Sequence, residues 1–279
     1  MTRPLILITN DDGLASPGLA AAVRAVCGLG DLLIAAPAQQ QSGMGRSLPG
    51  YNSCAITRHT LTIGDHAYTA YAVDGSPAQA VLHALLALAD RPPALAISGI
   101  NHGENLGTGT TVSGTVGAVL QAADMGAPGL AVSLEVPKEF HYNHDSGDTI
   151  AWTVGEHFTR LFAQRILEDG LPEGVHAINV NIPATATART PWRVTRQALQ
   201  PYFRLINIDR ELRLGAPRTL DYDIYVNWET LAEDTDIWAF LRDRVVSVTP
   251  LSLDLSRGID REALELLWRE EMAARNDAR

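Results

Sequence analysis

Short apolar runs and amphipathic segments alternate along the first two thirds of the chain. Four of these runs have the length of buried strands, and they lie at Leu5–Thr9, Asp31–Ala36, Ala94–Ser98 and Gly129–Leu134. Helical patterns fall between several of them, which is typical of a parallel sheet covered by helices on both faces. We therefore predict an α/β fold with a mainly parallel sheet.

Three further patterns predict helices. Ser16-Pro17 and Ser76-Pro77 each place an N-cap serine before a proline at the first helical position, and an apolar segment follows each pair. From Thr149 onward, apolar residues recur at helical spacing, namely Ile150, Val154, Phe158, Leu161 and Phe162. This spacing predicts an amphipathic helix with one apolar face.

The other segments predict additional strands and a terminal helix. Tyr51–Val73 has the pattern of a small antiparallel pair, and Ala177–Pro183 that of another strand. Pro201–Glu229 predicts a long hairpin, which cannot bury both of its faces alone, so we expect it to pack against another subunit. Arg244–Pro250 predicts a last strand. Asp260–Arg275 predicts a helix with four apolar residues on one side, Leu264, Leu267, Trp268 and Met272.

Charge and composition narrow the possible partners. The net charge is −10, from 22 basic and 32 acidic residues, which disfavours binding to a nucleic-acid polymer. A small anionic substrate would need local positive potential from a divalent cation, a helix N-terminus or backbone amides. The first apolar run is too short for a signal or a membrane span, and only Cys27 and Cys54 are present. We expect a soluble, cytoplasmic protein without a membrane partner.

Two adjacent carboxylates directly follow the first strand, in Asn10-Asp11-Asp12-Gly13. An Asx-turn would explain a lone Asn-Asp or Asp-Gly pair. Two ionised carboxylates about 5 Å apart, however, repel each other by about 3 kcal/mol at an effective dielectric constant of about 20, unless a cation or a proton intervenes. A hard divalent ion such as Mg²⁺ or Mn²⁺ resolves this repulsion. We therefore interpret Asp11 and Asp12 as catalytic residues that hold a cation.

Two more unusual loops follow predicted strands. Ligands bind at the carboxyl ends of parallel strands, so these loops should converge with the aspartates on one crevice. One loop, APAQQQSGMGRS, contains Ser42, and the other is the glycine-rich segment from Ser98 to Gly117. In the second loop, Asn101 offers a neutral amide ligand. Ser113-Gly114-Thr115 opens a helix there, whose N-terminus suits an anion.

Other phosphate and nucleophile motifs are not supported. Gly109–Thr115 contains both Walker A glycines, but a threonine stands where lysine is required. The nearest GxGxxG match, from Gly107, has Val112 at the third glycine, which disfavours an oxidoreductase. No GxSxG surrounds either candidate serine. An aspartyl-phosphate route would need a spaced carboxylate pair, whereas these two are contiguous.

Three loop histidines, His102, His141 and His144, are possible acids or ligands. Histidines in loops are more often exposed to solvent, and we expect these three to be exposed. We therefore leave them out of the predicted site.

The motifs occur together, in the same order, in one known family. They are ILITNDDG, AP followed by QSG, SGIN.G.N.G with SGTVGA, GAPGLAVS, NVNIP and VSVTPL. In these motifs the chain resembles the SurE family of stationary-phase survival proteins, which are metal-dependent 5′- and 3′-nucleotidases. The resemblance covers nearly the whole chain. NDDG together with SGIN.G.N.G is its specific part.

The resemblance implies a domain organisation and an assembly. Residues 1–183 would form a Rossmann-like α/β catalytic core with three layers. Residues 184–279 would contain an extended β-hairpin exchanged between subunits (about 201–229), a return strand (about 244–250) and a terminal helix. A homodimer or homotetramer would follow from this exchange.

The resemblance also implies a site. One divalent ion per subunit, Mg²⁺, Mn²⁺ or Co²⁺, would be held by four residues, Asp11, Asp12, Ser42 and Asn101. Phosphate and substrate would be held by a second set, Asn10, Asn105, Ser113, Gly114 and Thr115. The family commonly has tyrosine where this chain has Val112, so the base and sugar preference stays open.

The implied reaction is the hydrolysis of nucleoside 5′- and 3′-monophosphates to nucleoside and phosphate, extended in some members to short polyphosphate. Water is the expected nucleophile. Its proton could pass to one of the aspartates, or a metal-bound hydroxide could attack directly. The alternative is a non-catalytic module that binds a nucleotide or a phosphorylated ligand in the same crevice.

Overall fold

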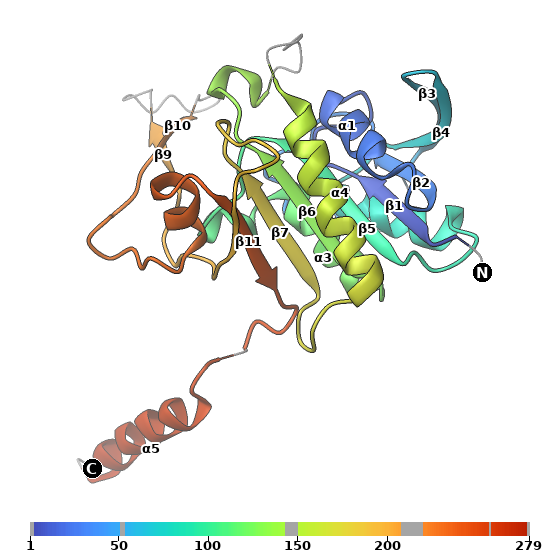
Figure 1. Cartoon of the computed structure of the whole chain (residues 1–279). Helices are drawn as coiled ribbons and strands as arrows, with labels where there is room; N and C mark the ends of the chain where they lie inside the picture. The colour runs from blue at the N-terminus through green and yellow to red at the C-terminus, as the bar shows by residue number, and fades with distance from the viewer. Residues whose placement is uncertain (1–2, 51–53, 143–149, 208–219, 257, 278–279) are drawn as a thin grey trace.

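The computed structural model describes residues 3–50, 54–142, 150–207, 220–256 and 258–277. Within them, nine strands form one sheet in the order β3-β4-β2-β1-β5-β6-β7-β11-β8, and β9 and β10 form a separate pair (Figure 1). The strands are β1 (Leu5–Thr9), β2 (Asp31–Pro37), β3 (Ile56–Ile63), β4 (His66–Val73), β5 (Leu95–His102), β6 (Gly129–Leu134), β7 (Ala177–Ile182), β8 (Trp192–Val194), β9 (Phe203–Asn207), β10 (Leu220–Ile224) and β11 (Val246–Leu251). The longer helices are α1 (Pro17–Val26), α2 (Pro77–His83), α3 (Gly114–Asp124), α4 (Trp152–Asp169) and α5 (Arg261–Asp277). Short helical turns are η1 (Ala84–Leu88), η2 (Thr108–Thr111), η3 (Lys138–Phe140) and η5 (Trp238–Arg242).

The predicted α/β architecture is confirmed, and the alternation of side chains along the strands explains its layers. On β1, Ile6 and Ile8 pack in one core with residues of α1 and α4. Leu5 and Leu7 point to the opposite face and pack with residues of α2 and α3. Strands β2, β1, β5, β6 and β7 run parallel, so both of their faces need an apolar cover. The sheet is the middle layer between the two helix pairs (Figure 1).

The predicted strands are present, with bounds that differ by one or two residues at β2, β7 and β11 and by more at β5, where the difference affects the site. β1 and β6 have the predicted bounds, but β5 continues to His102 instead of ending at Ser98. Its pairing with β6 shifts register after Ser98 and resumes with Asn101 opposite Ser133. The apolar run ends before this irregularity, so it could not indicate the extension. Asn101, expected in a loop, therefore lies on the strand.

The predicted helix starts are confirmed by their capping contacts. The hydroxyl of Ser16 accepts a hydrogen bond from the Gly18 amide, and Ser76 forms a capping box with Gln79. At Gly18, an added Cβ would lie 1.9 Å from the carbonyl oxygen of Ile100, so glycine lets α1 approach β5 closely. The predicted amphipathic helix begins at Trp152, and Thr149 lies outside the described residues.

The two edges of the sheet carry the shorter predicted strands. β3 and β4 form the predicted antiparallel pair, although residues 51–53 of that segment lie outside the described part. At the other edge, β11 runs antiparallel to β7 and parallel to β8. The return strand predicted at Arg244–Pro250 thus joins the main sheet.

The predicted hairpin is present as the antiparallel pair of β9 and β10, and its residues 208–219 lie outside the described part. Beside it lies a small third core, made of Leu106, Ala198, Tyr202, Leu231, Ile237 and Phe240. Exchange of the hairpin between subunits stays a prediction.

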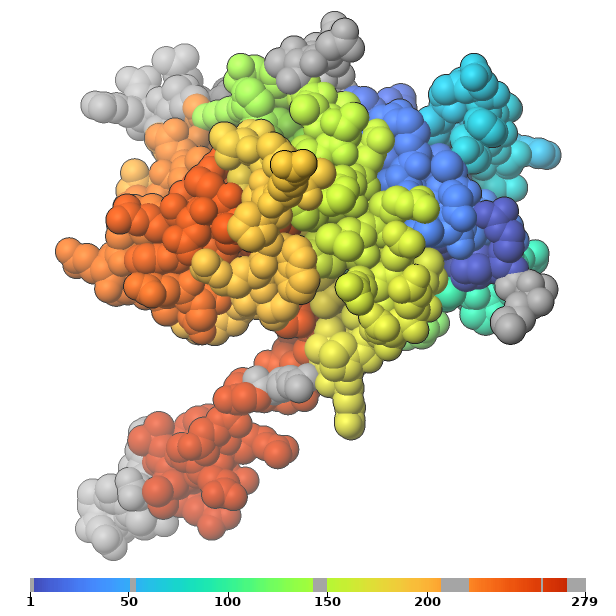
Figure 2. All heavy atoms as spheres, viewed as in Figure 1, coloured from blue at the N-terminus to red at the C-terminus, as the bar shows by residue number. Residues whose placement is uncertain are grey.

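The predicted terminal helix is present as α5, which stands away from the body of the molecule (Figures 1 and 2). Leu267 and Trp268, on its predicted apolar side, are 61% and 58% exposed. None of the helices in the described ranges is both long and apolar enough to cross a membrane.

Candidate active site

A cavity of about 460 Å³ lies where the carboxyl ends of β1 and β5 meet the loop after β2. Five of the predicted site residues line it, namely Asp11, Ser42, Asn101, Asn105 and Ser113. The other four, Asn10, Asp12, Gly114 and Thr115, lie in contact with those residues or with their neighbours. We call Asp11, Ser42, Asn101 and Ser113 the floor of the cavity. The structure therefore brings together the three loops that the sequence predicted to converge.

The side chain of Asn10 stabilises the turn after β1 and does not line the cavity. Its amide nitrogen donates to the Gly13 carbonyl oxygen at 3.0 Å, and its oxygen accepts from the Gly13 amide at 3.1 Å. Gly13 has φ of 97°, a left-handed conformation that favours glycine. Asn10 thus fixes the turn that presents the two aspartates.

Asp11 is buried against the N-terminus of α3. Its Oδ1 accepts a 2.6 Å hydrogen bond from the Thr115 hydroxyl. An added Cβ at Gly114 would lie 2.7 Å from the Asp11 Cβ, so the helix approaches the carboxylate as closely as glycine allows. Burial, and then the charge of Asp12, raise the pKa of Asp11 to about 7. The ionised pair is therefore disfavoured without a compensating charge.

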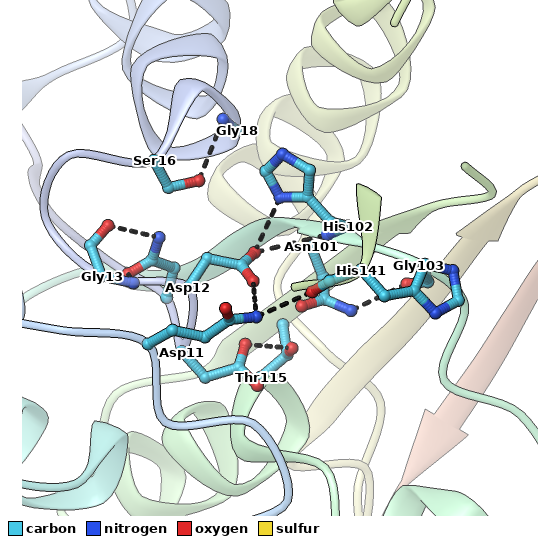
Figure 3. Close-up of polar contacts among 12 residues, drawn as sticks. Asp11, Asp12, Gly13, Ser16, Gly18, Asn101, His102, Gly103, Thr115 and His141 are labelled. Atoms are coloured by element: carbon cyan, nitrogen blue, oxygen red, sulfur yellow. Dashed lines mark hydrogen bonds and ion pairs between the residues drawn. The ribbon is translucent and has the colours of Figure 1, made fainter. Parts of the chain in front are cut away.

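Asp12 is held by His102 at the end of β5. Its Oδ2 lies 3.1 Å from His102 Nδ1 and accepts from the His102 amide at 3.3 Å (Figure 3). The imidazole packs edge-on against Trp152 of α4, with ring centroids 4.8 Å apart. The expectation that His102 is exposed is wrong, because the strand extends to this residue and α4 covers it; its side chain is fully buried.

Gln40 connects three parts of the site through one amide nitrogen. This Nε2 lies 2.9 Å from the Ser42 hydroxyl, 3.3 Å from Asp12 Oδ1 and 2.8 Å from the His141 carbonyl oxygen. Gln40 therefore places the predicted serine ligand beside the aspartate pair and ties both to the segment after β6.

Asn101 and Asn105 are fixed by their amide nitrogens. Asn101 Nδ2 donates to the Gly103 carbonyl oxygen at 2.7 Å, so its Oδ1 is the atom able to serve as a ligand. Asn105 Nδ2 donates to the Ser133 hydroxyl at 2.9 Å, and its backbone amide donates to Asn181 at 2.7 Å. The loop after β5 is thus anchored to the neighbouring strands.

Ser113 caps α3, which points its N-terminus at the cavity. The serine hydroxyl accepts a hydrogen bond from the Val116 amide at 3.1 Å. The helix has eleven residues, and the unpaired amides of its first turn give this end a positive potential. An anion bound in the cavity would lie at that end.

Another part of the cavity lining is aromatic. Tyr202, Phe203 and Tyr222, which we call the aromatic wall, come from the segment beyond residue 200. His141 stacks on Tyr222 with an interplanar angle of 8°, and its Nδ1 lies 2.7 Å from the Tyr222 hydroxyl. Burial lowers the pKa of His141, which is half-buried here and not exposed as expected. His144 lies outside the described residues.

Sequence reasoning missed Gln40, His102 and Glu104, all of which belong to this site. Gln40 and His102 contact predicted ligands, and Glu104 lines the cavity. For Gln40 and Glu104, the only signal in the sequence was that each lies within three residues of a predicted ligand, Ser42 or Asn101. His102 was considered as an acid or ligand and left out, because its burial could not be predicted. In the described part of the chain, no three His, Cys, Asp or Glu side chains cluster as a metal site. The predicted ligand set contains only two such residues, with a hydroxyl and an amide completing it.

Comparison with known proteins agrees with the motifs. The chain matches the family model described as Survival protein SurE over residues 6–204. It is 42% identical over 253 residues to the 5′-nucleotidase SurE of Methanocella arvoryzae, covering 90% of this chain and 92% of that protein. With the 5′-nucleotidase SurE of Thermococcus kodakarensis it shares 39% identity over 259 residues, with 92% and 95% covered.

A solved structure shows the same similarity in three dimensions. The crystal structure of the SurE protein from Aquifex aeolicus matches with a TM-score of 0.73 and 30% sequence identity, covering 95% of this chain and 99% of that one. The resemblance inferred from the order of the motifs is therefore confirmed, and the chain belongs to the SurE family.

Proposed function

We propose that this chain is a metal-dependent 5′-nucleotidase, which hydrolyses nucleoside 5′-monophosphates to nucleoside and phosphate. The observation that carries the proposal is the pair of buried carboxylates at a cavity that also receives the N-terminus of α3. The aromatic wall of the same cavity suits a nucleoside. The name 5′-nucleotidase SurE, carried by the relatives, supports this reaction. Nucleoside 3′-monophosphates are further proposed substrates, on the family resemblance.

The donor atoms at the floor fit one divalent ion per subunit, Mg²⁺, Mn²⁺ or Co²⁺. Asp11 and Asp12 would contribute carboxylates, Ser42 a hydroxyl and Asn101 an amide oxygen, a set of hard ligands. The raised pKa of Asp11 fits a site whose charge is balanced only when a cation is bound. Among the described lining residues there is no lysine or arginine, so a phosphate dianion needs that cation and the helix N-terminus.

Electrostatic stabilisation must supply most of the catalysis. Uncatalysed phosphate monoester hydrolysis is so slow that acceleration of up to ~10²¹-fold can be required. One general base contributes only ~10²–10⁴-fold. A bound ion would supply a Lewis acid at a phosphoryl oxygen and a lowered pKa for its water.

The chain's own residues hold the substrate and orient the carboxylates. The amides at the start of α3 and the side chain of Asn105 would hold the remaining phosphate oxygens. Thr115 fixes Asp11, and His102 fixes Asp12, by hydrogen bonds from different elements. The geometry of the pair is therefore set before substrate binds, which is what electrostatic catalysis requires.

We also propose that the active protein is a homodimer or homotetramer in which the β9–β10 hairpin is exchanged. Leu205 and Ile224 on this hairpin are 69% and 53% exposed, which supports burial against another subunit. Residues 1–183 would form the catalytic core, and residues 184–279 would contribute the hairpin, the return strand and the terminal helix.

Asp12→Asn tests the proposed activity. The substitution keeps the size of the side chain but removes a charge from the ligand set, so we expect phosphate release from AMP or GMP to fall at least ~10²-fold. Phosphate release is measured after chelation and after readdition of each metal. Asp65→Asn, at an exposed turn, is the matched control.

Three results would contradict the proposal. Near-normal turnover without metal would exclude the assigned ion, and normal turnover by Asp12→Asn would exclude the assigned ligand. Tight nucleotide binding with no phosphate release in Mg²⁺, Mn²⁺ or Co²⁺ would instead identify a non-catalytic binding module.

A further inference from the structure

Strand β7 carries two asparagines that the proposed mechanism does not use. Asn179 and Asn181 are fully buried, whereas Val180 between them packs into the apolar core shared with α1 and α4. Side chains alternate along a strand, so both asparagines lie on the other face, where Ala177 packs against α3. A buried polar side chain is unfavourable unless it forms hydrogen bonds. The partners of Asn179 and Asn181 therefore indicate why polar residues occupy this face.

Both asparagines form hydrogen bonds with the backbone of Asn105, which we assign to phosphate binding. The Asn105 amide donates to Asn181 Oδ1 at 2.7 Å, and Asn181 Nδ2 donates to the Asn105 carbonyl oxygen at 3.1 Å. Asn179 Nδ2 donates to the same carbonyl oxygen at 2.9 Å. Within the described ranges, the backbone of Asn105 has no other hydrogen bond. A single carboxamide, that of Asn181, therefore holds both polar backbone groups of Asn105.

The backbone around Asn105 has no regular structure that could fix this residue. Asn105 lies after the end of β5, between Gly103 and Gly107, which have φ of 106° and 54°. These conformations favour glycine, and the chain at such a loop is not paired with a neighbouring strand. The position of Asn105 therefore depends on the side chains that bind it.

The side chain of Asn105 connects this backbone anchor to the site. Its Nδ2 carries two hydrogens and donates to the Ser133 hydroxyl at 2.9 Å and to the Thr115 hydroxyl at 3.4 Å. The second contact is long, and Thr115 already donates its own proton to Asp11 at 2.6 Å. Since Asn105 lines the cavity, the hydrogen in the long contact is the one that a phosphate oxygen can accept. Its direction depends on how the backbone of Asn105 is held.

Other residues hold the proposed metal ligands. Thr115 and His102 form hydrogen bonds with the two aspartates. The side chain of Asn181 forms its hydrogen bonds with Asn105 and, among the described residues, with none of the four proposed metal ligands. Loss of the Asn181 side chain should therefore affect the binding of phosphate and leave the binding of the metal ion in place.

We infer that Asn181 is a positioning residue for the phosphate group, which acts by holding Asn105 in place at the cavity. This inference rests on the proposed nucleotidase function. Without Asn181, Asn105 can shift, and its Nδ2 then no longer meets a phosphate oxygen at hydrogen-bond distance. Asn179 has a smaller part, because only Asn181, among the described residues, binds the Asn105 amide.

Asn181→Leu in the full chain tests this role, because leucine has a similar size and forms neither hydrogen bond. KM for AMP and the inhibition constant of inorganic phosphate against p-nitrophenyl phosphate hydrolysis should each rise about tenfold or more. The dissociation constant of Mn²⁺, measured by electron paramagnetic resonance of the free ion, should stay at its wild-type value. A protein that is merely less stable would instead show fewer Mn²⁺ sites and a lower kcat, with KM unchanged.

Two further variants separate phosphate positioning from a general effect of changing this face. Asn179→Leu is the matched control, since Asn179 is equally buried on the same strand but binds only the Asn105 carbonyl oxygen. It should raise KM and the phosphate inhibition constant less than Asn181→Leu does. Asn181→Asp keeps the size and the acceptor but places an oxygen against the Asn105 carbonyl oxygen. It should raise both constants and provides the comparison if Asn181→Leu does not fold.

The possible outcomes distinguish the inference from the proposed function. Unchanged KM and phosphate inhibition constants in the Asn181 variants would overturn the inference and leave the nucleotidase function standing. An equal loss of Mn²⁺ affinity, an equal effect of Asn179→Leu, or failure of both Asn181 variants to fold would also overturn it. If the wild-type protein releases no phosphate with any of the metals, the proposed function is wrong. Calorimetry with inorganic phosphate on wild type and Asn181→Leu then decides the inference separately.

Discussion

At the residue scale, hydrogen-bond donors from separate elements explain how two adjacent aspartates remain buried. Thr115 contacts one carboxylate, His102 and Gln40 contact the other, and Asn10 holds the turn between them and α1. These contacts orient the pair but add no fixed positive charge from lysine or arginine. The negative charge of the two carboxylates is therefore not balanced by these contacts, which is the physical reason to expect a cation at the pair.

The buried carboxyl group of Glu104 leads to a prediction about how the stability of the protein depends on pH. Its folded-state pKa is about 7, against an ordinary value of 4.5. A raised pKa means that the folded state binds more protons between these values, so stability falls as pH rises through this range. The difference corresponds to roughly 3 kcal/mol. Glu104→Gln removes this titration, so its stability relative to wild type should rise by up to that amount between about pH 4.5 and 8.

Urea unfolding at several pH values measures this difference, in the absence of metal and substrate. Glu173→Gln, at an exposed carboxyl, should show no comparable trend. A difference between Glu104→Gln and wild type that does not change with pH would show that Glu104 titrates at its ordinary value in the folded protein.

The sequence was informative about the residues whose position follows from topology. Asp11 and Ser42 follow β1 and β2, and Asn101 lies near the carboxyl end of the neighbouring parallel strand β5, so their convergence was predictable from strand order alone. Gln40 and Glu104 lie beside those residues in the sequence, but their roles come from burial and from partners such as His141 and Tyr202. A single sequence does not indicate which polar side chains will be buried.

At the element scale, the position of α3 against the end of β1 determines the shape of the floor. The helix begins at Gly114, where even a methyl group would lie within 2.8 Å of the Asp11 carboxylate Oδ2. Glycine at this position allows the N-terminus of the helix to approach a charged side chain closely. The sequence showed the serine cap and the helix, but the distance between helix and aspartate depends on the packing of both elements on the sheet.

Gly114→Ala tests this close approach. The added Cβ must push Asp11 or the start of α3 away, so we expect the metal concentration for half-maximal phosphate release to rise about tenfold or more. By helix propensity alone, alanine would stabilise α3 slightly. The effect of displacing Asp11 on metal binding can therefore be distinguished from the effect on helix stability. A metal titration of phosphate release, together with thermal unfolding, provides the measurement.

Gly28→Ala is the matched control, since its Cβ would meet nothing closer than 3.8 Å. If Gly114→Ala binds metal and turns over substrate like this control, the helix start is not part of the metal site.

The elements themselves were largely predictable, and the exceptions have physical causes. Apolar runs and serine-proline pairs gave β1, β6, α1 and α2 with correct starts or bounds. The extension of β5 to His102 was missed, because its last residues pair with β6 only after a register shift that no apolar pattern marks.

At the scale of the whole molecule, segments beyond residue 200 complete the cavity. The aromatic wall comes from β9, β10 and the residue before β9, and it contacts the segment after β6 through Tyr222 and His141. Lys138 adds an ion pair with Asp221 on β10. Substrate binding therefore depends on how the hairpin lies, which connects the site to the proposed assembly of subunits.

The hairpin surface provides the last prediction. Ile224 on β10 is 53% exposed, and an unpaired carboxylate placed in an apolar interface is strongly unfavourable. If the hairpin is exchanged between subunits, Ile224→Asp should shift the protein from a homodimer or homotetramer to a smaller species at micromolar concentration, as measured by light scattering after size-exclusion chromatography. Leu86→Asp, which alters a 72% exposed leucine on η1, should leave the assembly unchanged. A wild-type monomer would refute the assembly, and an unaltered Ile224→Asp oligomer would place the interface elsewhere on the surface.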